Sequence, residues 1–293
     1  MQHGPAVRRR KLGAELRSLR SRAGLTSGEA ARLVGWHQSK VSRIETGTSG
    51  AKPADVRLLL DAYAVNDPHL RQVMLALAGS VDGDGAGREH WWHAYRGVLP
   101  PAYRDFISLE SQARAMRTLE TTVVPGLLQT PAYAREVTRA AAAGVDGDWL
   151  DTLVEVRMAR QDVLRAQPPL KLSAVLDEAV LKREIGGPEV MAEQRERLVE
   201  AAQLPQVQLQ VLPFSAGAHI GVTGPFVIFS FSSTSDLDVV VLDHLTSSLH
   251  LERKEDLQAY TEAFDALRAH ALSPEESLAH LAGTAAGPPR RDG

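Results

Sequence analysis

The first 78 residues have the apolar spacing of a small, all-helical domain. Leu12, Leu16 and Leu19 recur at helical intervals between residues 10 and 23, and Gly24 ends that helix. Similar spacing, together with a capping-box pair and two first-turn prolines, predicts four more short helices. Two of them cover residues 26–35 and 38–45, and the other two begin at Pro53 and Pro68.

Beyond residue 87, helical periods are mixed with short apolar runs. The helical spacing predicts helices at residues 101–118, 131–142, 147–166, 188–202, 253–270 and 274–282. Runs of β-branched and apolar residues between turn residues predict strands at 170–176, 207–212, 226–231 and 239–242. The predicted fold class is therefore α+β, with an all-α five-helix domain followed by a larger mixed α/β domain.

Two segments of biased composition set the domain boundaries. Residues 79–87 contain four glycines and two aspartates, and such a segment cannot bury a core, so we predict a flexible linker there. The predicted domains are residues 1–78 and residues 88–283. Residues 284–293 are polar and rich in Pro and Gly, and we predict that they form a disordered tail.

The formal net charge of −3 is an average over two unlike parts. Residues 1–78 hold 13 Lys and Arg against 6 Asp and Glu, a net charge of +7, whereas residues 79–293 have a net charge of −10. A basic part joined to an acidic part indicates one module for a polyanion and a second module with another task.

The sequence also excludes some classes of protein. It has no Cys, which rules out disulfides, a thiol nucleophile and cysteine-ligated metal sites. No apolar run approaches the roughly 18 residues of a membrane span. No hydrophobic secretory stretch follows the basic residues at the start of the sequence. We therefore expect a cytoplasmic protein that does not cross a membrane.

The segment from Ser27 to Thr46 fits the geometry of a helix-turn-helix. Two short helices that cross steeply need a small residue at their contact, which is Ala31, and a turn residue that tolerates positive φ, which is Gly35. The apolar residues that would hold both helices against their neighbours occur at the required offsets. They are Ala30, Val34, Val41 and Ile44.

The residues LRSLRSRAGLTSGEAARLVGWHQSKVSRIETG resemble the Xre/Cro-type phage-repressor helix-turn-helix domain. This resemblance implies that the helix beginning near Gln38 enters the major groove of double-stranded DNA. Gln38, Ser39 and Arg43 are then the expected base contacts, and Lys40 serves either a base or a phosphate. Ser42 lies on the next turn of the same face. The backbone contacts implied by the resemblance are Ser27 and the loop of Thr46, Thr48, Ser49 and Lys52.

Several of these residues have plainer interpretations. Gln38 and Ser39 could simply cap their helix, and Arg43 could be an ordinary solvated side chain. The run from Arg8 to Lys11 is either a phosphate or minor-groove arm or a basic tail. Relatives often have Gln where this chain has Ser27, so the bracing of the recognition helix by that residue is open.

The larger part of the chain resembles the C-terminal domain of WhiJ-like actinobacterial regulators. The resemblance rests on segments that occur in order: WWHAY, Glu110, VVPGLLQTPAYAR, LDEAVLKREIGGPEVMAEQ, VQLQVLPFSAGAH, GPFVIFSF and ALSPEESL. It implies a transcription factor with an antitoxin-like domain and a small protein partner encoded nearby. We expect a homodimer, in which this domain joins the subunits or receives a signal. The alternative is a ligand-sensing regulator with a small-molecule pocket in this domain.

Other candidate sites in the larger part have weak signals. Asp177 and Glu178 are adjacent, and on a strand they would point to opposite faces. The histidines at 219, 244 and 250 and the aspartates at 236, 238 and 243 lack metal-ligand spacing. Trp91, Trp92 and Tyr95 either line a pocket or pack in a core, and the leucines of VPGLLQT dock into a core or onto a partner. We therefore expect no enzyme activity, no metal and no cofactor.

Overall fold

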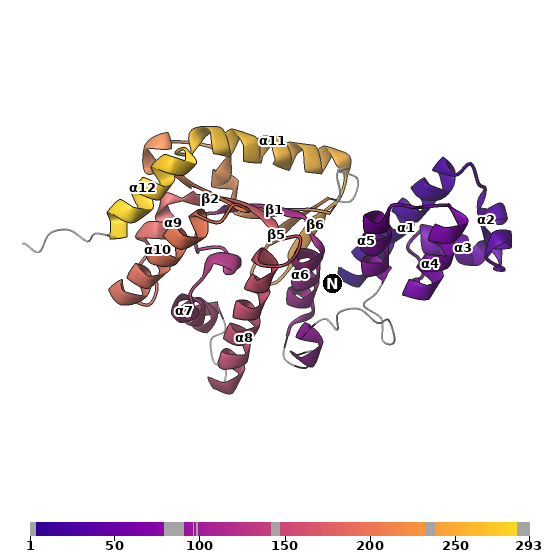
Figure 1. Cartoon of the computed structure of the whole chain (residues 1–293), viewed down its shortest axis with the longest axis horizontal. Coiled ribbons are helices and arrows are strands. Elements are labelled where there is room, and N and C mark those ends of the chain that lie inside the picture. The colour runs from indigo at the N-terminus through magenta and orange to yellow at the C-terminus, as the bar shows by residue number, and fades with distance from the viewer. Residues whose placement is uncertain are drawn as a thin grey trace, which may run out of the picture. The chain divides into compact units, whose positions relative to one another are not determined.

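A computed structural model describes residues 4–78, 91–95, 97, 99–141, 147–231 and 238–285 of the chain. The chain divides into two compact units, residues 1–94 with 231–237 and residues 95–230 with 238–293 (Figure 1). Within the described residues, no helix has the length and the hydropathy needed to cross a membrane.

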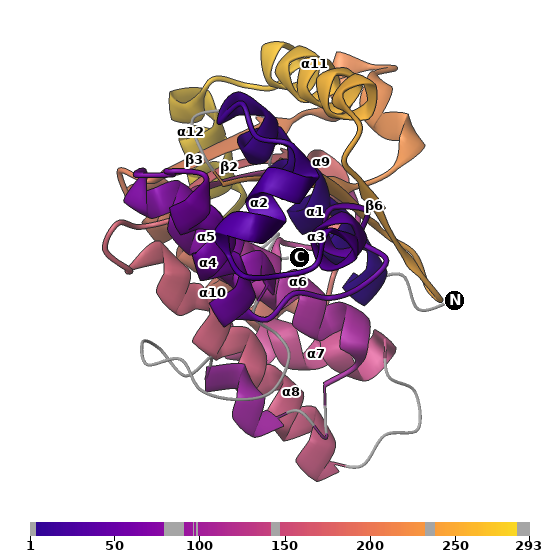
Figure 2. The ribbon, with the colours of Figure 1, turned by 90° about the vertical axis from the view of Figure 1, so that its right-hand side faces the viewer.

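The N-terminal unit is a bundle of five helices, as the apolar spacing predicts (Figure 2). Its helices are α1 (Gly4–Arg22), α2 (Ser27–Leu33), α3 (Gln38–Glu45), α4 (Pro53–Ala62) and α5 (Pro68–Ala78). Leu16, Val41 and Leu59 are fully buried and belong to one apolar cluster to which the helices contribute. Val41 and Ile44, one helical turn apart on α3, hold this helix against its neighbours through the cluster.

Local signals define where α2 begins and ends. Thr26 and Glu29 form a reciprocal capping box, in which each side chain accepts a hydrogen bond from the other residue's backbone N–H. Gly35 has a φ of 68°, which makes the turn between α2 and α3 possible without strain. The helix-turn-helix geometry expected from the sequence is therefore present.

The C-terminal unit is built on a six-stranded sheet of order β3-β2-β1-β4-β5-β6. The strands β1 (Ala115–Glu120), β2 (Lys171–Asp177) and β3 (Val207–Leu212) are parallel. The strands β4 (Phe226–Ser230), β5 (Val239–Asp243) and β6 (Ser248–Leu251) are antiparallel to their neighbours. The sheet thus joins a parallel half to an antiparallel half at β1.

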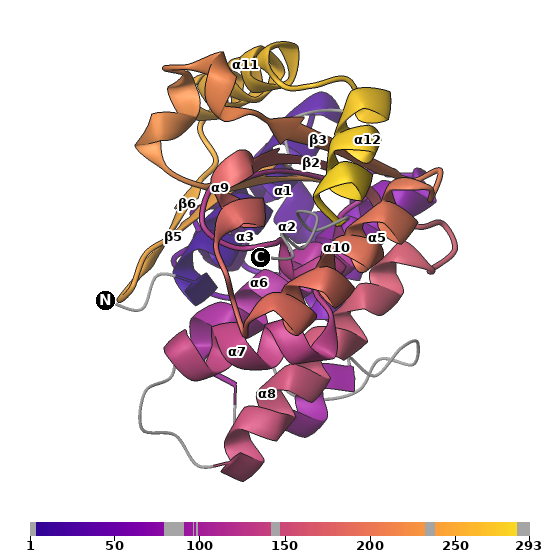
Figure 3. The same cartoon turned by 90° about the vertical axis from the view of Figure 1, so that its left-hand side faces the viewer.

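Helices cover both faces of this sheet (Figure 3). They are α6 (Pro101–Gln112), α7 (Pro131–Ala141), α8 (Gly147–Ala159), α9 (Glu178–Lys182), α10 (Pro188–Ala202), α11 (Lys254–His270) and α12 (Pro274–Ala285). On one face, Phe264 of α11 packs with Phe226 and Leu119 of the sheet. On the other face, the ring of Phe106 in α6 meets Phe229 edge-on at 5.2 Å between centroids.

The predicted fold class is confirmed, and some predicted elements are wrong. The helix predicted at 101–118 ends at Gln112, and residues 115–120 form β1 instead. Buried Met116 and Leu119 have a helical spacing of three, but hydrogen bonding to β2 and β4 on both sides makes this segment a strand. The helix predicted at 147–166 becomes 3₁₀ from Arg160 on. The spacing did not predict α9 and β6.

Two predicted segments fall largely outside the described residues. The linker predicted at 79–87 lies entirely outside them. The tail predicted at 284–293 overlaps α12, which continues to Ala285, and residues 286–293 lie outside the described part.

Candidate nucleic-acid interface

Helix α3 presents one apolar and one polar face. Val41 and Ile44 are buried in the domain core. Five residues of α3 were predicted to contact DNA. Four of them are exposed on the opposite face, and Lys40 is only partly exposed. The four are Gln38, Ser39, Ser42 and Arg43. The N-cap of α3 is His37, which makes no side-chain cap hydrogen bond, so Gln38 and Ser39 are placed one and two residues inside the helix.

Gln38 is held in place by a residue of α2. Its Nε2 donates a hydrogen bond to Ser27 Oγ over 3.1 Å. Ser27 thus connects α2 to the first residue of α3. An amide group has two N–H donors and a carbonyl acceptor, so Gln38 keeps one N–H and its Oε1 for a further partner. That pair of groups matches the N7 and N6 edge of adenine.

Lys40 has protein partners of its own. Its Nζ lies 2.9 Å from Asp55 Oδ1 of α4 and 3.6 Å from the ring centroid of Trp36. The carboxylate of Asp55 also accepts the backbone N–H of Lys52 over 3.3 Å. Lys40 is thus drawn towards α4, and Trp36 packs, partly buried, against the apolar cluster of the N-terminal unit.

The loop after α3 is polar and exposed. The hydroxyl of Thr46 bonds the backbone O of Ser42 over 2.9 Å and meets the hydroxyl of Thr48 at 2.8 Å. Both threonines and Lys52 are exposed. Ser27 therefore lies at the start of α2, the exposed residues lie on α3, and the polar loop follows α3 directly. The side chains of residues 8–11, the possible basic arm, lie outside the described side chains.

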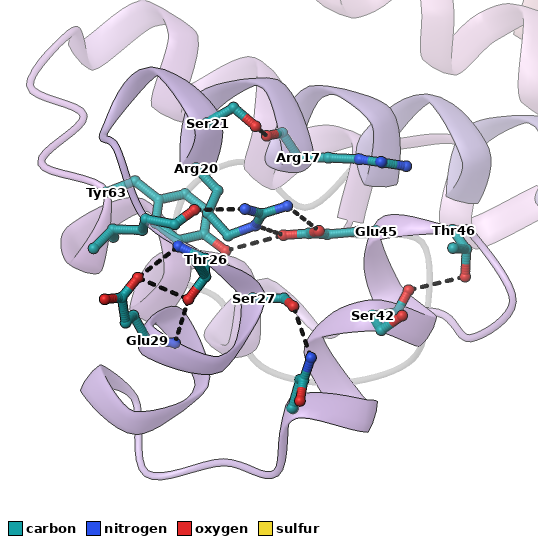
Figure 4. A network of polar contacts seen from close by, with 12 residues as sticks. Arg17, Arg20, Ser21, Thr26, Ser27, Glu29, Ser42, Glu45, Thr46 and Tyr63 are labelled. Atoms are coloured by element: carbon teal, nitrogen blue, oxygen red, sulfur yellow. Dashed lines mark hydrogen bonds and ion pairs between the residues drawn. The ribbon is translucent and has the colours of Figure 1, made fainter.

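A partly buried ion pair and a tyrosine hydroxyl join α3 to α1 and to the end of α4 (Figure 4). Arg20 Nε and one terminal nitrogen bond the two carboxylate oxygens of Glu45 at 2.7 and 3.0 Å. Tyr63 OH donates to the same carboxylate over 3.4 Å. Burial, followed by the charge of Glu45, raises the pKa of Tyr63 above its usual range, so its hydroxyl stays protonated as a donor. The group fixes α3 at its C-terminal end.

Sequence patterns alone did not identify Arg20, Glu45 or Gly13. Gly13 lies where α1 meets α3, and a Cβ there would lie 2.4 Å from the backbone O of Ile44 and 2.6 Å from that of Glu45. Its spacing among the leucines of α1 marks only a helix. Arg20 and Glu45 are 25 residues apart, and no local pattern links them.

In the C-terminal unit, the adjacent carboxylates of Asp177 and Glu178 both bond the protein backbone. Asp177 caps α9 by accepting the N–H of Ala179 over 2.8 Å, and Glu178 accepts the N–H of Phe214 over 2.9 Å. Among the described residues, no three His, Asp or Glu side chains are grouped so that they could hold a metal ion. Asp236 lies outside the described residues.

The VPGLLQT segment docks into the core of the C-terminal unit. Leu127 and Leu128 are buried. Gln194 of α10, also buried, accepts the N–H of Thr130 and donates to the O of Leu128, both over 2.8 Å.

Trp91 and Trp92 meet edge-to-face at 5.6 Å, and Trp92 is buried.

Two known families match the chain, one in its N-terminal part and one in its C-terminal part. Residues 11–74 match the family described as a helix-turn-helix domain. With the geometry of α2 and α3, this match supports a DNA-binding regulator of the helix-turn-helix class. Residues 103–283, more than half of the chain, match the family described as a domain of unknown function (DUF5753), and the chain belongs to that family. No curated protein and no solved structure matches the chain.

Proposed function

We propose that the protein is a sequence-specific DNA-binding transcriptional regulator that acts as a repressor or autoregulator. One observation carries this proposal: Ser27 holds Gln38 by a single hydrogen bond that leaves the groups able to read adenine. Arg43, exposed one turn further on, has the donors to read guanine. Ser39 is the third proposed base contact, and Ser42 lies beside it.

The remaining nominated residues are proposed to contact the DNA backbone. Ser27, Thr46, Thr48 and Lys52 flank α3 and would set its register on the duplex. Lys40 is a backbone or base contact only when its ion pair with Asp55 opens, because that pair occupies its ammonium group.

Selection of duplexes from a random library tests the readout. The double variant Gln38→Ala with Arg43→Ala is expected to lose sequence preference, because each base contact contributes about 1–3 kcal/mol of discrimination. A matched control removes the same residue types from exposed positions of α4 and α5, as Arg57→Ala with Gln72→Ala. If the first variant selects the same sequences as the parent, α3 does not read the bases.

We further propose that the DUF5753 domain forms a homodimer and responds to a small protein partner encoded nearby. The resemblance to WhiJ-like regulators supports this role. The net charge of −10 on residues 79–293 argues against a grip on DNA by this part, because phosphates repel it. In a dimer, two helix-turn-helix domains would contact half-sites about one helical turn apart.

Two measurements separate this role from the competing assignment of a small-molecule sensor. Sedimentation of the purified chain reports the dimer, and co-purification with products of adjacent reading frames reports the partner. A monomer without a partner, whose melting temperature rises with a metabolite, would instead support the sensor. We assign no catalytic reaction, metal or cofactor, and we propose a cytoplasmic location.

A further inference from the structure

A polar hollow of about 170 Å³ opens between α1, α2 and α3 (Figure 4). Its lining combines two arginines, one carboxylate and three hydroxyl side chains: Arg17, Arg20, Ser27, Ser42, Glu45 and Thr46. A water molecule occupies about 30 Å³ in the liquid, so the hollow has room for a larger group. It adjoins the exposed face of α3 through Ser42 and Ser27.

The charges in the hollow do not cancel. Arg20 and Glu45 neutralise each other through two hydrogen bonds, and a further N–H of Arg20 is donated to the backbone O of Leu25 over 2.6 Å. Arg17 is exposed, and its guanidinium has no hydrogen bond or ion pair within the described part of the chain. The hollow therefore has one uncompensated positive charge.

The hydroxyls supply donors beside this charge. Ser27 Oγ accepts from Gln38, so the proton of Ser27 remains available for another acceptor. The hydroxyl of Ser42 has no partner within the described part of the chain, although its backbone O accepts from Thr46. A guanidinium and two free hydroxyl donors around a hollow are suited to a singly charged, oxygen-rich anion.

We propose that this hollow receives a backbone phosphate of the bound DNA, with Arg17 supplying the charge and Ser27 and Ser42 the hydrogen bonds. This inference rests on the proposed function. It adds a residue of α1 to the interface and links two kinds of contact, because Ser27 would bond the phosphate while it holds Gln38. The phosphate would then help to fix the amide that reads the base.

Titration of the full chain with a random-sequence duplex tests the role of Arg17, since a phosphate contact needs no operator. Arg17→Gln is expected to weaken binding about tenfold and to reduce the slope of log affinity against log salt by about 0.9. The loss should be equal for random and selected duplexes. Arg17→Lys should retain the slope. Arg57→Gln is the matched control, because it removes an exposed arginine that does not line the hollow.

Duplexes in which single phosphates are replaced by neutral methylphosphonates locate the contact. At one position, the replacement should weaken DNA binding by the parent protein but leave the DNA affinity of the Arg17→Gln variant unchanged. If Arg17→Gln behaves like Arg57→Gln, or every position weakens both proteins equally, the inference is wrong. It is also wrong if inorganic phosphate stabilises the parent through Arg17 while DNA binding ignores this residue. If these effects are seen but the double variant Gln38→Ala with Arg43→Ala selects the same sequences as the parent, the result counts against the proposed base readout alone.

Discussion

At the scale of single residues, α1 packs against the end of α3 at a residue without a side chain. Gly13 allows α1 to rest on the last carbonyls of α3, those of Ile44 and Glu45. The position of α3 therefore depends on the absence of one methyl group on α1. The neighbouring backbone cannot yield as a flexible side chain would.

The substitution Gly13→Ala is expected to lower the stability of the N-terminal unit by about 1–3 kcal/mol. Alanine gains roughly 1 kcal/mol over glycine within a helix, so the loss would be larger still without this gain. Hydrogen exchange of the amides in α1 and α3 measures it. Gly28→Ala in α2 is the matched control, since its Cβ would meet nothing closer than 4.0 Å. Equal exchange in the two variants would refute the contact.

A second residue-scale prediction concerns Glu120, at the carboxyl end of β1. Burial, followed by the nearby charge of Asp243, raises its pKa to about 8, against the hydrogen bond that Thr118 donates to it. The unfolded chain releases this proton near pH 4.5, whereas the folded chain retains it until about pH 8. The folded state thus binds more protons in this window, and its stability falls as the pH rises.

The substitution Glu120→Gln is expected to remove this loss. The contribution reaches at most about 1.4 kcal/mol per pH unit between the two pKa values. Denaturant unfolding of the C-terminal unit at about pH 5 and about pH 8 should show that the unfolding free energy of the variant, relative to that of the parent, increases with pH. Glu193→Gln, at an exposed position of α10, serves as the control. A constant difference between the variants would mean that Glu120 does not titrate in this window.

At the scale of elements, a single buried amide ties α10 to the segment before α7. Gln194 satisfies one backbone donor and one backbone acceptor there, on Thr130 and Leu128. Gln194→Ala leaves both groups buried without a partner, and we expect a loss of about 2–4 kcal/mol in unfolding free energy. Glu196→Ala, exposed on the same helix, should change it by less than about 0.5 kcal/mol. Thermal unfolding compares the two variants.

Elements with their own local signals could be predicted from the sequence. Helix α10 and strand β3 begin and end at the predicted residues, because their caps, turns and apolar periods agree. Strand β1 could not be predicted, since its partners are contributed by residues 171–176 and 226–230. The candidate interface divides in the same way. The exposed positions of Gln38 and Arg43 on α3 could be predicted from the motif, and their role as base contacts stays a prediction. The positions of Arg17, Arg20 and Gly13 next to α3 depend on the packing of α1, which no local pattern shows.

At the scale of the whole molecule, charge is segregated between the two parts of the sequence, +7 on residues 1–78 and −10 on residues 79–293. Binding to DNA by the basic part should release counterions. Log affinity is then expected to fall linearly with log salt, with a slope of about −0.9 for each phosphate contacted. Fluorescence anisotropy with a labelled duplex measures the slope, and a duplex with a neutral backbone should give none. A flat response with ordinary DNA would contradict the assignment of the basic part.

The order of strands in the sheet has a consequence for synthesis of the chain on the ribosome. The five helices of the N-terminal bundle and the apolar cluster that joins them lie within residues 4–78, among the residues that the structure describes, so this cluster can form once residue 78 has been made. In contrast, β1 at residues 115–120 lacks one of its two neighbours until β4 at residues 226–230 has been translated. Contacts across such sequence distances form slowly. The nascent chain therefore acquires its DNA-binding part first, more than a hundred residues before the sheet can close.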